Sequence, residues 1–173
     1  TARAITRLAG VNINGKDREW QSNHTLSEDD YKKGVKLLKL AATLQYTLVG
    51  LPSLYYGDEA GLTGGSDPFC RGCYPWGNEN SDLLAFYKKL GAARRDCPAF
   101  KEGSLTFLAV GLGYVLFKRQ DESSAAIIGI NRWNADEQLT LDEDLSGYKA
   151  VFGDKPDGNR LTIKGEDIVF FKR

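Results

Sequence analysis

Two adjacent acids, Asp58 and Glu59, follow a short apolar segment, residues 51–56, and a glycine. Carboxyl groups can serve as acids, bases or nucleophiles, and barrel enzymes keep their catalytic groups at the C-terminal ends of buried strands. Two carboxyl groups that act on one bond must face each other across it, whereas adjacent residues of a strand point to opposite sides. We therefore expect no catalytic residue here, and Asp58 and Glu59 to be acceptors that fix the loop through backbone amides.

The glycine-rich loop that follows contains an acid and a base four residues apart, Asp67 and Arg71, and then Trp76. A carboxylate and a planar guanidinium can each form two hydrogen bonds to vicinal hydroxyl groups, or they can pair with each other in a salt bridge of little energetic value. Trp76 and the nearby tyrosines have flat apolar faces that suit ligand contact, although most aromatic residues beside a strand end belong to the core. The aromatic residue that we prefer as a ligand contact is Trp76.

Three cysteines, Cys70, Cys73 and Cys97, cannot all pair within one chain. The spacing of Cys70 and Cys73 would suit half a zinc site, but a structural zinc site needs four ligands and the chain has no second pair. A local disulfide and reduced thiols are the other interpretations, and reduced thiols are favoured. The odd number favours a reducing compartment, such as the cytoplasm.

In the first hundred residues, segments with helical periodicity lie before and after residues 51–56. Residues 1–8 begin a helix that Gly10 ends, and residues 11–25 are polar and aperiodic, as in a surface loop. Ser27 caps a long helix with apolar residues on more than one side, and Asn80 or Ser81 caps another that Pro98 stops. Residues 51–56 lack polar alternation, which predicts a strand covered on both faces in a parallel sheet.

From about Phe100 the apolar period becomes alternating. Short candidate strands separated by turn residues predict an antiparallel sandwich. These strands are residues 105–110, 113–119, 125–131, 137–141, 148–152, 160–163 and 168–172. The boundary falls near residues 97–100, and the lone parallel strand must borrow hydrogen-bond partners from more polypeptide, a second chain or a symmetry copy.

Composition excludes several classes of partner. Hydrophobic residues make up 42% and charged residues 27%, with 23 acids balancing 23 bases, so bulk charge attracts neither nucleic acid nor a membrane surface. No apolar run approaches the roughly 20 residues of a bilayer span. The chain contains no methionine, so we expect that Thr1 is not an encoded start and that further sequence precedes it.

The motifs of residues 50–61 (GLPSLYYGDEAG), 64–71 (GGSDPFCR) and 74–77 (YPWG) closely resemble the eighth strand and following loop of α-amylase family glycoside hydrolases. The resemblance implies an α/β part, residues 1–98, that ends a (β/α)8 barrel with helix 7, strand 8 and helix 8. An all-β part, residues 99–173, would then form a C-terminal sandwich of Greek-key type.

The resemblance also implies a function, cleavage of α-glucosidic bonds in starch-like glucans or maltooligosaccharides with retention. In neopullulanase-like and cyclomaltodextrinase-like members, residues matching Asp67 and Arg71 contact a glucose unit, although residues 72–77 are closer to α-amylase and amylopullulanase relatives. The catalytic carboxylates of the family lie upstream of Thr1, so the isolated chain should be inactive and should need the rest of the barrel as its partner.

No redox cofactor or metal is expected, and calcium in the intact enzyme is left open. The resemblance leaves two rival functions, a transglycosylase or isomerising member of the same family, and a non-catalytic starch-binding or structural module.

Overall fold

The computed structural model describes residues 2–173, which separate into two compact units. The first unit takes the described residues up to Ala42 together with Ser53–Lys88, and the second takes Thr43–Pro52 and Lys89–Arg173. Among the described residues, no helix combines the length and the apolar character needed to cross a membrane. The division at residue 98 into a barrel part and a sandwich part stays a prediction.

The first unit holds the helices α1 (Ala4–Leu8) and α2 (Arg18–Asn23), most of α3 (Glu28–Thr47) and the start of α4 (Ser81–Arg95). Hydroxyl and amide caps begin the two long helices, as the sequence predicts. The Asp30 N–H donates to the Ser27 hydroxyl at 3.1 Å, and the Leu83 N–H donates to the Asn80 side chain at 2.9 Å. These caps satisfy backbone donors that a helix N-terminus leaves without partners.

The apolar residues of α3 and α4 are largely buried. Leu38 and Leu40, which lie on nearly opposite sides of α3, are both buried, so this helix packs on more than one side. On α4 the apolar residues at three- and four-residue spacing are buried, namely Leu83, Phe86, Tyr87, Leu90 and Ala93. By contrast, Val49 lies beyond the end of α3 and is 71% exposed.

Two predictions for the first hundred residues are wrong. Residues 51–56 form neither a strand nor a buried segment, and Leu51 is 93% exposed. Because both sheets of the described chain are antiparallel and lie in the second unit, no neighbour is present for a parallel strand at this position. Residues 11–25 are not entirely a loop, because Asp17 caps α2 by accepting from the Trp20 N–H at 2.8 Å.

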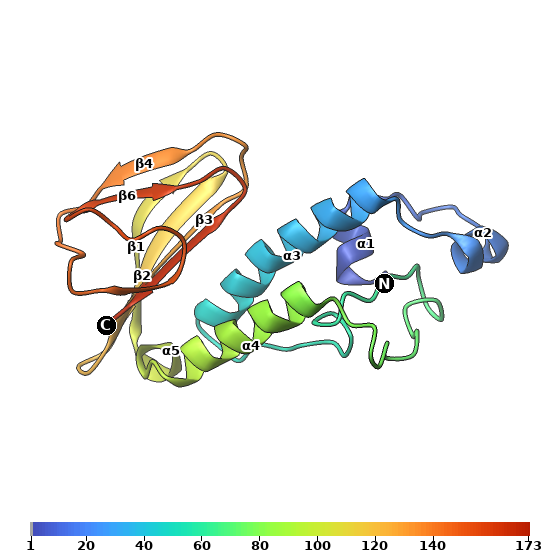
Figure 1. Cartoon of the computed structure of the whole chain (residues 1–173), viewed down its shortest axis with the longest axis horizontal. Helices are drawn as coiled ribbons and strands as arrows, with labels where there is room; N and C mark the ends of the chain where they lie inside the picture. Colours follow the sequence, from blue (N-terminus) through green and yellow to red (C-terminus); the bar gives the residue numbers. More distant parts are fainter. Residues whose placement is uncertain (1) are drawn as a thin grey trace. The chain divides into compact units, whose positions relative to one another are not determined.

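The second unit is a two-layer antiparallel sandwich beside the short helix α5 (Ala99–Glu102). One sheet has the order β1-β2-β3-β7-β5, formed by Ser104–Gly111, Tyr114–Gln120, Ala125–Asn131, Ile168–Lys172 and Lys149–Phe152. The other pairs β4 (Glu137–Thr140) with β6 (Arg160–Ile163), which lie side by side in Figure 1. After β3 the chain alternates between the two sheets, and all seven predicted strands are confirmed.

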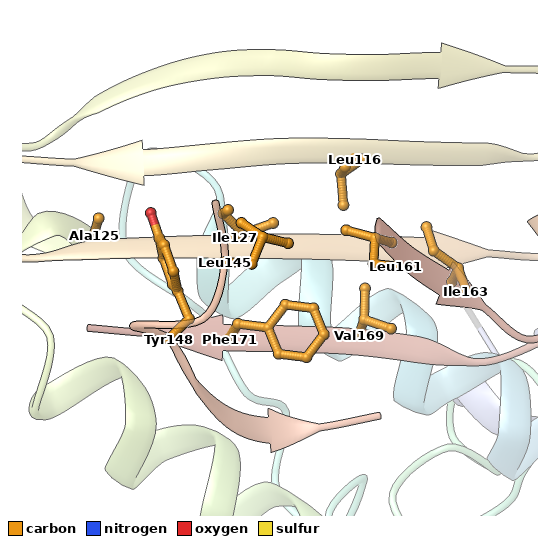
Figure 2. Close-up of a cluster of buried hydrophobic side chains, with 9 residues drawn as sticks. All are labelled: Leu116, Ala125, Ile127, Leu145, Tyr148, Leu161, Ile163, Val169 and Phe171. Carbon is orange, nitrogen blue, oxygen red and sulfur yellow. The ribbon is translucent and has the colours of Figure 1, made fainter. Parts of the chain in front are cut away.

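The core of the sandwich lies between its two sheets. Figure 2 shows side chains of the larger sheet pointing toward side chains of β6 and of the connection before β5. The buried residues of this cluster are Leu116, Ala125, Ile127, Leu145, Tyr148, Leu161, Ile163, Val169 and Phe171. Every residue of β3 is buried, so this central strand is covered on both faces.

A buried arginine in the second unit donates hydrogen bonds to backbone carbonyls of several elements. Arg119 on β2 is fully buried, and its guanidinium donates to the carbonyl oxygens of Thr47, Ala99, Gly103 and Ser104 at 2.9, 2.9, 3.0 and 3.2 Å. Thr47 is the last residue of α3 and Gly103 follows α5, so Arg119 satisfies carbonyls at the C-terminal ends of both helices, and it is a second donor to the Ala99 carbonyl, which also accepts from the Gly103 N–H at 3.0 Å.

Candidate functional site

The loop between α3 and α4 in the first unit carries the predicted site residues, and α1 and α2 hold its backbone in place. The Arg3 N–H donates to the Gly64 carbonyl at 3.1 Å, and the Gly64 N–H donates to the Thr6 hydroxyl at 3.0 Å. From α2, the Gln21 side chain accepts from the Ser66 N–H at 2.8 Å. The loop is therefore fixed by both short helices just before Asp67.

A tight turn opens this loop and needs a glycine. Gly57 has a φ of +83°, and an added Cβ would lie 2.3 Å from the Leu62 side chain. A residue with a side chain would be strained and would also collide with Leu62. The Tyr56 hydroxyl donates to the Gly72 carbonyl at 3.0 Å, so the start of the turn also supports the far side of the loop.

Asp67 and Arg71 come together on the surface of the loop. Arg71 Nε lies 2.5 Å from Asp67 Oδ1, and the two side chains are 67% and 56% exposed, respectively. An exposed ion pair of this kind adds little stability. The two side chains can therefore separate and bind a ligand instead, at a small cost in free energy. Together they present a planar donor group and an acceptor group to solvent.

Trp76 is the most exposed aromatic residue of the loop. Its side chain is 80% exposed, and its ring lies against that of Tyr74 with centroids 4.5 Å apart and planes inclined at 47°. Tyr55 and Tyr56 are about half exposed, but both rings also lie against the Arg3 guanidinium, at 4.3 and 4.6 Å. Trp76 therefore has the larger free face.

Asp58 has different surroundings from the ones we predicted, and Oε2 of Glu59 is buried without a hydrogen-bond partner among the described residues. Asp58 Oδ1 accepts from the guanidinium of the buried Arg3 at 3.3 Å, rather than from backbone amides. Burial raises the pKa of the Asp58 carboxyl, and the charge and hydrogen bond of Arg3 oppose this increase. Arg3 Nη1 also donates to the Tyr56 carbonyl. Asp58 thus pairs with the charge of a buried arginine, and this contact serves the structure of the loop.

Sequence reasoning missed Arg3 because no local pattern marks it. It lies 55 residues from Asp58 and just before a five-residue helix, so neither periodicity nor spacing relates the two.

The cysteines are all free thiols, with Cys70 and Cys97 buried and Cys73 exposed. Within residues 2–173, no three His, Cys, Asp or Glu side chains are grouped closely enough to hold a metal ion.

Two curated relatives match most of this chain. An amylopullulanase of Thermoanaerobacterium saccharolyticum is 41% identical over 145 residues, which cover 76% of this chain and 11% of that enzyme. A cyclomaltodextrinase of Thermoanaerobacter pseudethanolicus is 40% identical over 146 residues, or 80% of this chain and 25% of the enzyme. The chain is homologous to α-amylase family enzymes.

Solved structures agree with this relationship. An α-amylase of Anoxybacillus has a TM-score of 0.72 and 29% identity, over 80% of this chain and 32% of that one. A debranching enzyme of Nostoc punctiforme has a TM-score of 0.66 and 27% identity, over 81% of this chain and 29% of that one. No family model matches the chain. The matched part of this chain corresponds to only 11–32% of the length of these four relatives.

Proposed function

We propose that this chain is the C-terminal part of a retaining glycoside hydrolase that acts on α-glucosidic bonds of starch-like glucans or maltooligosaccharides. The observation that carries the proposal is the exposed Asp67–Arg71 pair and the exposed Trp76 on one loop, whose backbone α1 and α2 fix. The homology to amylopullulanase and cyclomaltodextrinase supports the choice of an α-glucan.

The three loop residues would bind one end of a glucan chain. The guanidinium of Arg71 donates to adjacent hydroxyl groups of a glucose unit, while the carboxylate of Asp67 accepts from them. The exposed face of Trp76 packs against the C–H groups of the sugar, since the π-face of an indole is apolar and slightly negative. Binding of this kind positions the substrate and does not break a bond.

The first unit would complete a (β/α)8 barrel with the rest of the enzyme. The exposed apolar residues 51–56 would then become the eighth strand, paired on both sides and covered by helices. Retaining cleavage needs two carboxyl groups about 5–5.5 Å apart, and we place these groups, with the rest of the barrel, outside this chain. The isolated chain is accordingly inactive, and the reaction needs no redox cofactor.

One relative favours a second candidate, transfer of a glycosyl group rather than hydrolysis. A cyclomaltodextrin glucanotransferase of Bacillus licheniformis is 31% identical over 161 residues, or 86% of this chain. A transferase and a hydrolase share the same carboxyl chemistry and differ in whether water or a sugar accepts the glycosyl group. Analysis of the products of the complete enzyme separates these two functions.

The experiment uses the indole N–H signal of Trp76 in an NMR titration of the 173-residue chain with maltoheptaose. We expect this signal to move saturably, and Asp67→Asn or Arg71→Lys to weaken binding about tenfold, which corresponds to roughly 1.4 kcal/mol. The exposed pair Arg95 and Asp96, at 3.4 Å, offers the matched control Asp96→Asn, which should bind as wild type does.

Two results contradict the proposal. An unmoved Trp76 signal would remove the loop from glucan binding, and so would an Asp67→Asn variant that binds as tightly as wild type. In a parallel assay the chain alone should release no reducing ends from maltoheptaose. Turnover by the chain alone would show that the catalytic groups lie within these 173 residues.

A further inference from the structure

An exposed tryptophan in the second unit takes no part in the loop site. Trp133 follows β3 and is 47% exposed, although every residue of β3 itself is buried. Arg132 and Asn134, on either side of it, are also exposed. Together these residues expose a flat apolar ring and two groups that can form hydrogen bonds to one ligand.

The backbone that carries Trp133 is held by a buried asparagine. Asn131 is fully buried, and its Oδ1 accepts from the Trp133 N–H at 2.9 Å. Its Nδ2 donates to the carbonyl oxygens of Ala135 and Ile163 at 2.7 and 3.3 Å. One side chain thus fixes both ends of the turn around Trp133, and the cost of ordering this turn is already met before any ligand binds.

Further hydrogen bonds hold the turn from both neighbouring segments. The Arg132 N–H donates to the Gly113 carbonyl at 2.8 Å, and the Trp133 carbonyl accepts from the Glu166 N–H at 2.6 Å. The indole ring lies directly on Gly113, where an added Cβ would come within 1.3 Å of the ring. The ring is therefore supported on one side by the backbone of Gly113, while about half of the Trp133 surface is open to solvent.

We propose that Trp133, with Arg132 and Asn134, is a second glucan-binding site, separate from the loop of Asp67 and Arg71. The indole face packs on the C–H face of a glucose unit, and the guanidinium and the amide bond its hydroxyl groups. The choice of an α-glucan rests on the proposed function. The site would hold a long substrate on the sandwich without touching the bond that is cleaved.

The test uses the three tryptophans of the chain as independent reporters. In the same maltoheptaose titration, we expect the indole N–H of Trp133 to move saturably, with a dissociation constant in roughly the millimolar range because the surface is small. It should move equally in the Trp76→Ala variant. Cellohexaose, a β-linked glucan, should move it much less.

The outcomes separate this proposal from the previous one. A Trp133 signal that stays unmoved in a folded chain overturns the second site, whether or not the Trp76 signal moves. Movement of Trp133 alone supports the second site and contradicts the loop site. An equal response to cellohexaose overturns the assignment to α-glucans.

Variants that leave Trp133 in place test the polar contacts. Arg132→Ala and Asn134→Ala should each weaken binding at Trp133 about threefold to tenfold, whereas Arg95→Ala, at another exposed arginine of this unit, should leave it unchanged. Trp133→Phe keeps an aromatic face over Gly113 and should retain part of the affinity that Trp133→Ala loses. Unchanged affinity in both Arg132→Ala and Asn134→Ala would contradict the proposed hydroxyl contacts.

Discussion

At the scale of single residues, the sequence indicates which side chains reach the surface of the loop but not how the buried charges pair. Asp67 and Arg71 form a pair because they are four residues apart in one turn-rich segment. Asp58 was expected to bind backbone amides, and its partner is instead Arg3, which lies just before α1. Pairing of a buried charge depends on which segments meet in three dimensions, and that information is absent from local spacing.

A buried tyrosine in the second unit makes a prediction about alkaline pH. Tyr148 is 3% exposed, and burial together with the Glu143 carboxylate raises its pKa from 10.0 to about 12. Below pH 10 the folded and unfolded states both hold the phenolic proton. Between pH 10 and 12 the unfolded state loses this proton while the folded state keeps it, so stability falls as pH rises.

Replacing Tyr148 by phenylalanine removes this pH dependence. From about pH 9 to 12, wild type should lose about 1 kcal/mol more of unfolding free energy than Tyr148→Phe, after solvent screening is allowed for. Urea unfolding at several pH values measures the difference. Tyr114→Phe, which removes a hydroxyl from β2, is the matched control and should follow wild type. Parallel loss in wild type and Tyr148→Phe would show that Tyr148 does not carry the effect.

At the scale of elements, the predictions succeed where a local signal and tertiary packing agree. The caps at Ser27 and Asn80 and the alternating strands after Phe100 are confirmed, because each is specified within a few residues. Residues 51–56 have the composition of a buried strand, but a strand is stable only with hydrogen-bonded neighbours. α2 was missed because its six residues have no apolar stripe, and only the cap Asp17 marks it.

The fourfold hydrogen bonding of Arg119 predicts that several elements depend on one side chain. Arg119→Met would leave four backbone carbonyls without this donor, at the ends of α3 and α5 and the start of β1. The Ala99 carbonyl would keep its bond from the Gly103 N–H, but a buried acceptor without a partner costs about 1–3 kcal/mol, so the variant should lose at least about 2 kcal/mol of unfolding free energy. Urea unfolding followed by circular dichroism measures this loss.

Two further variants show whether the geometry of the guanidinium matters. Arg119→Lys keeps the charge but lacks the planar fork of five donors, so it should recover less than half of the loss. Arg160→Met, at an exposed arginine on β6, should change stability by less than about 0.5 kcal/mol. A lysine variant as stable as wild type would mean that charge alone, and not the fork, serves the four carbonyls.

At the scale of the whole molecule, the chain carries more exposed apolar surface around residues 49–56 than a self-contained domain needs. Val49 and Leu51 are 71% and 93% exposed, and Leu54, Tyr55 and Tyr56 are 40–47% exposed. Exposed apolar residues that lie close together along a chain tend to pair with other chains. In the proposed barrel this segment would find its partners in the rest of the enzyme, and in the isolated chain it has only other copies.

Self-association of the isolated chain should therefore depend on residues 51–56. Leu51→Asp combined with Leu54→Asp should shift the chain toward monomer, because two charges on the segment oppose pairing between copies. Leu112→Asp changes a leucine that is 82% exposed but lies between β1 and β2, and it is the matched control. Sedimentation velocity over a range of concentrations should show association in wild type and Leu112→Asp but much less in the double variant. If the double variant associates as strongly as wild type, the exposed segment is not the surface through which copies meet.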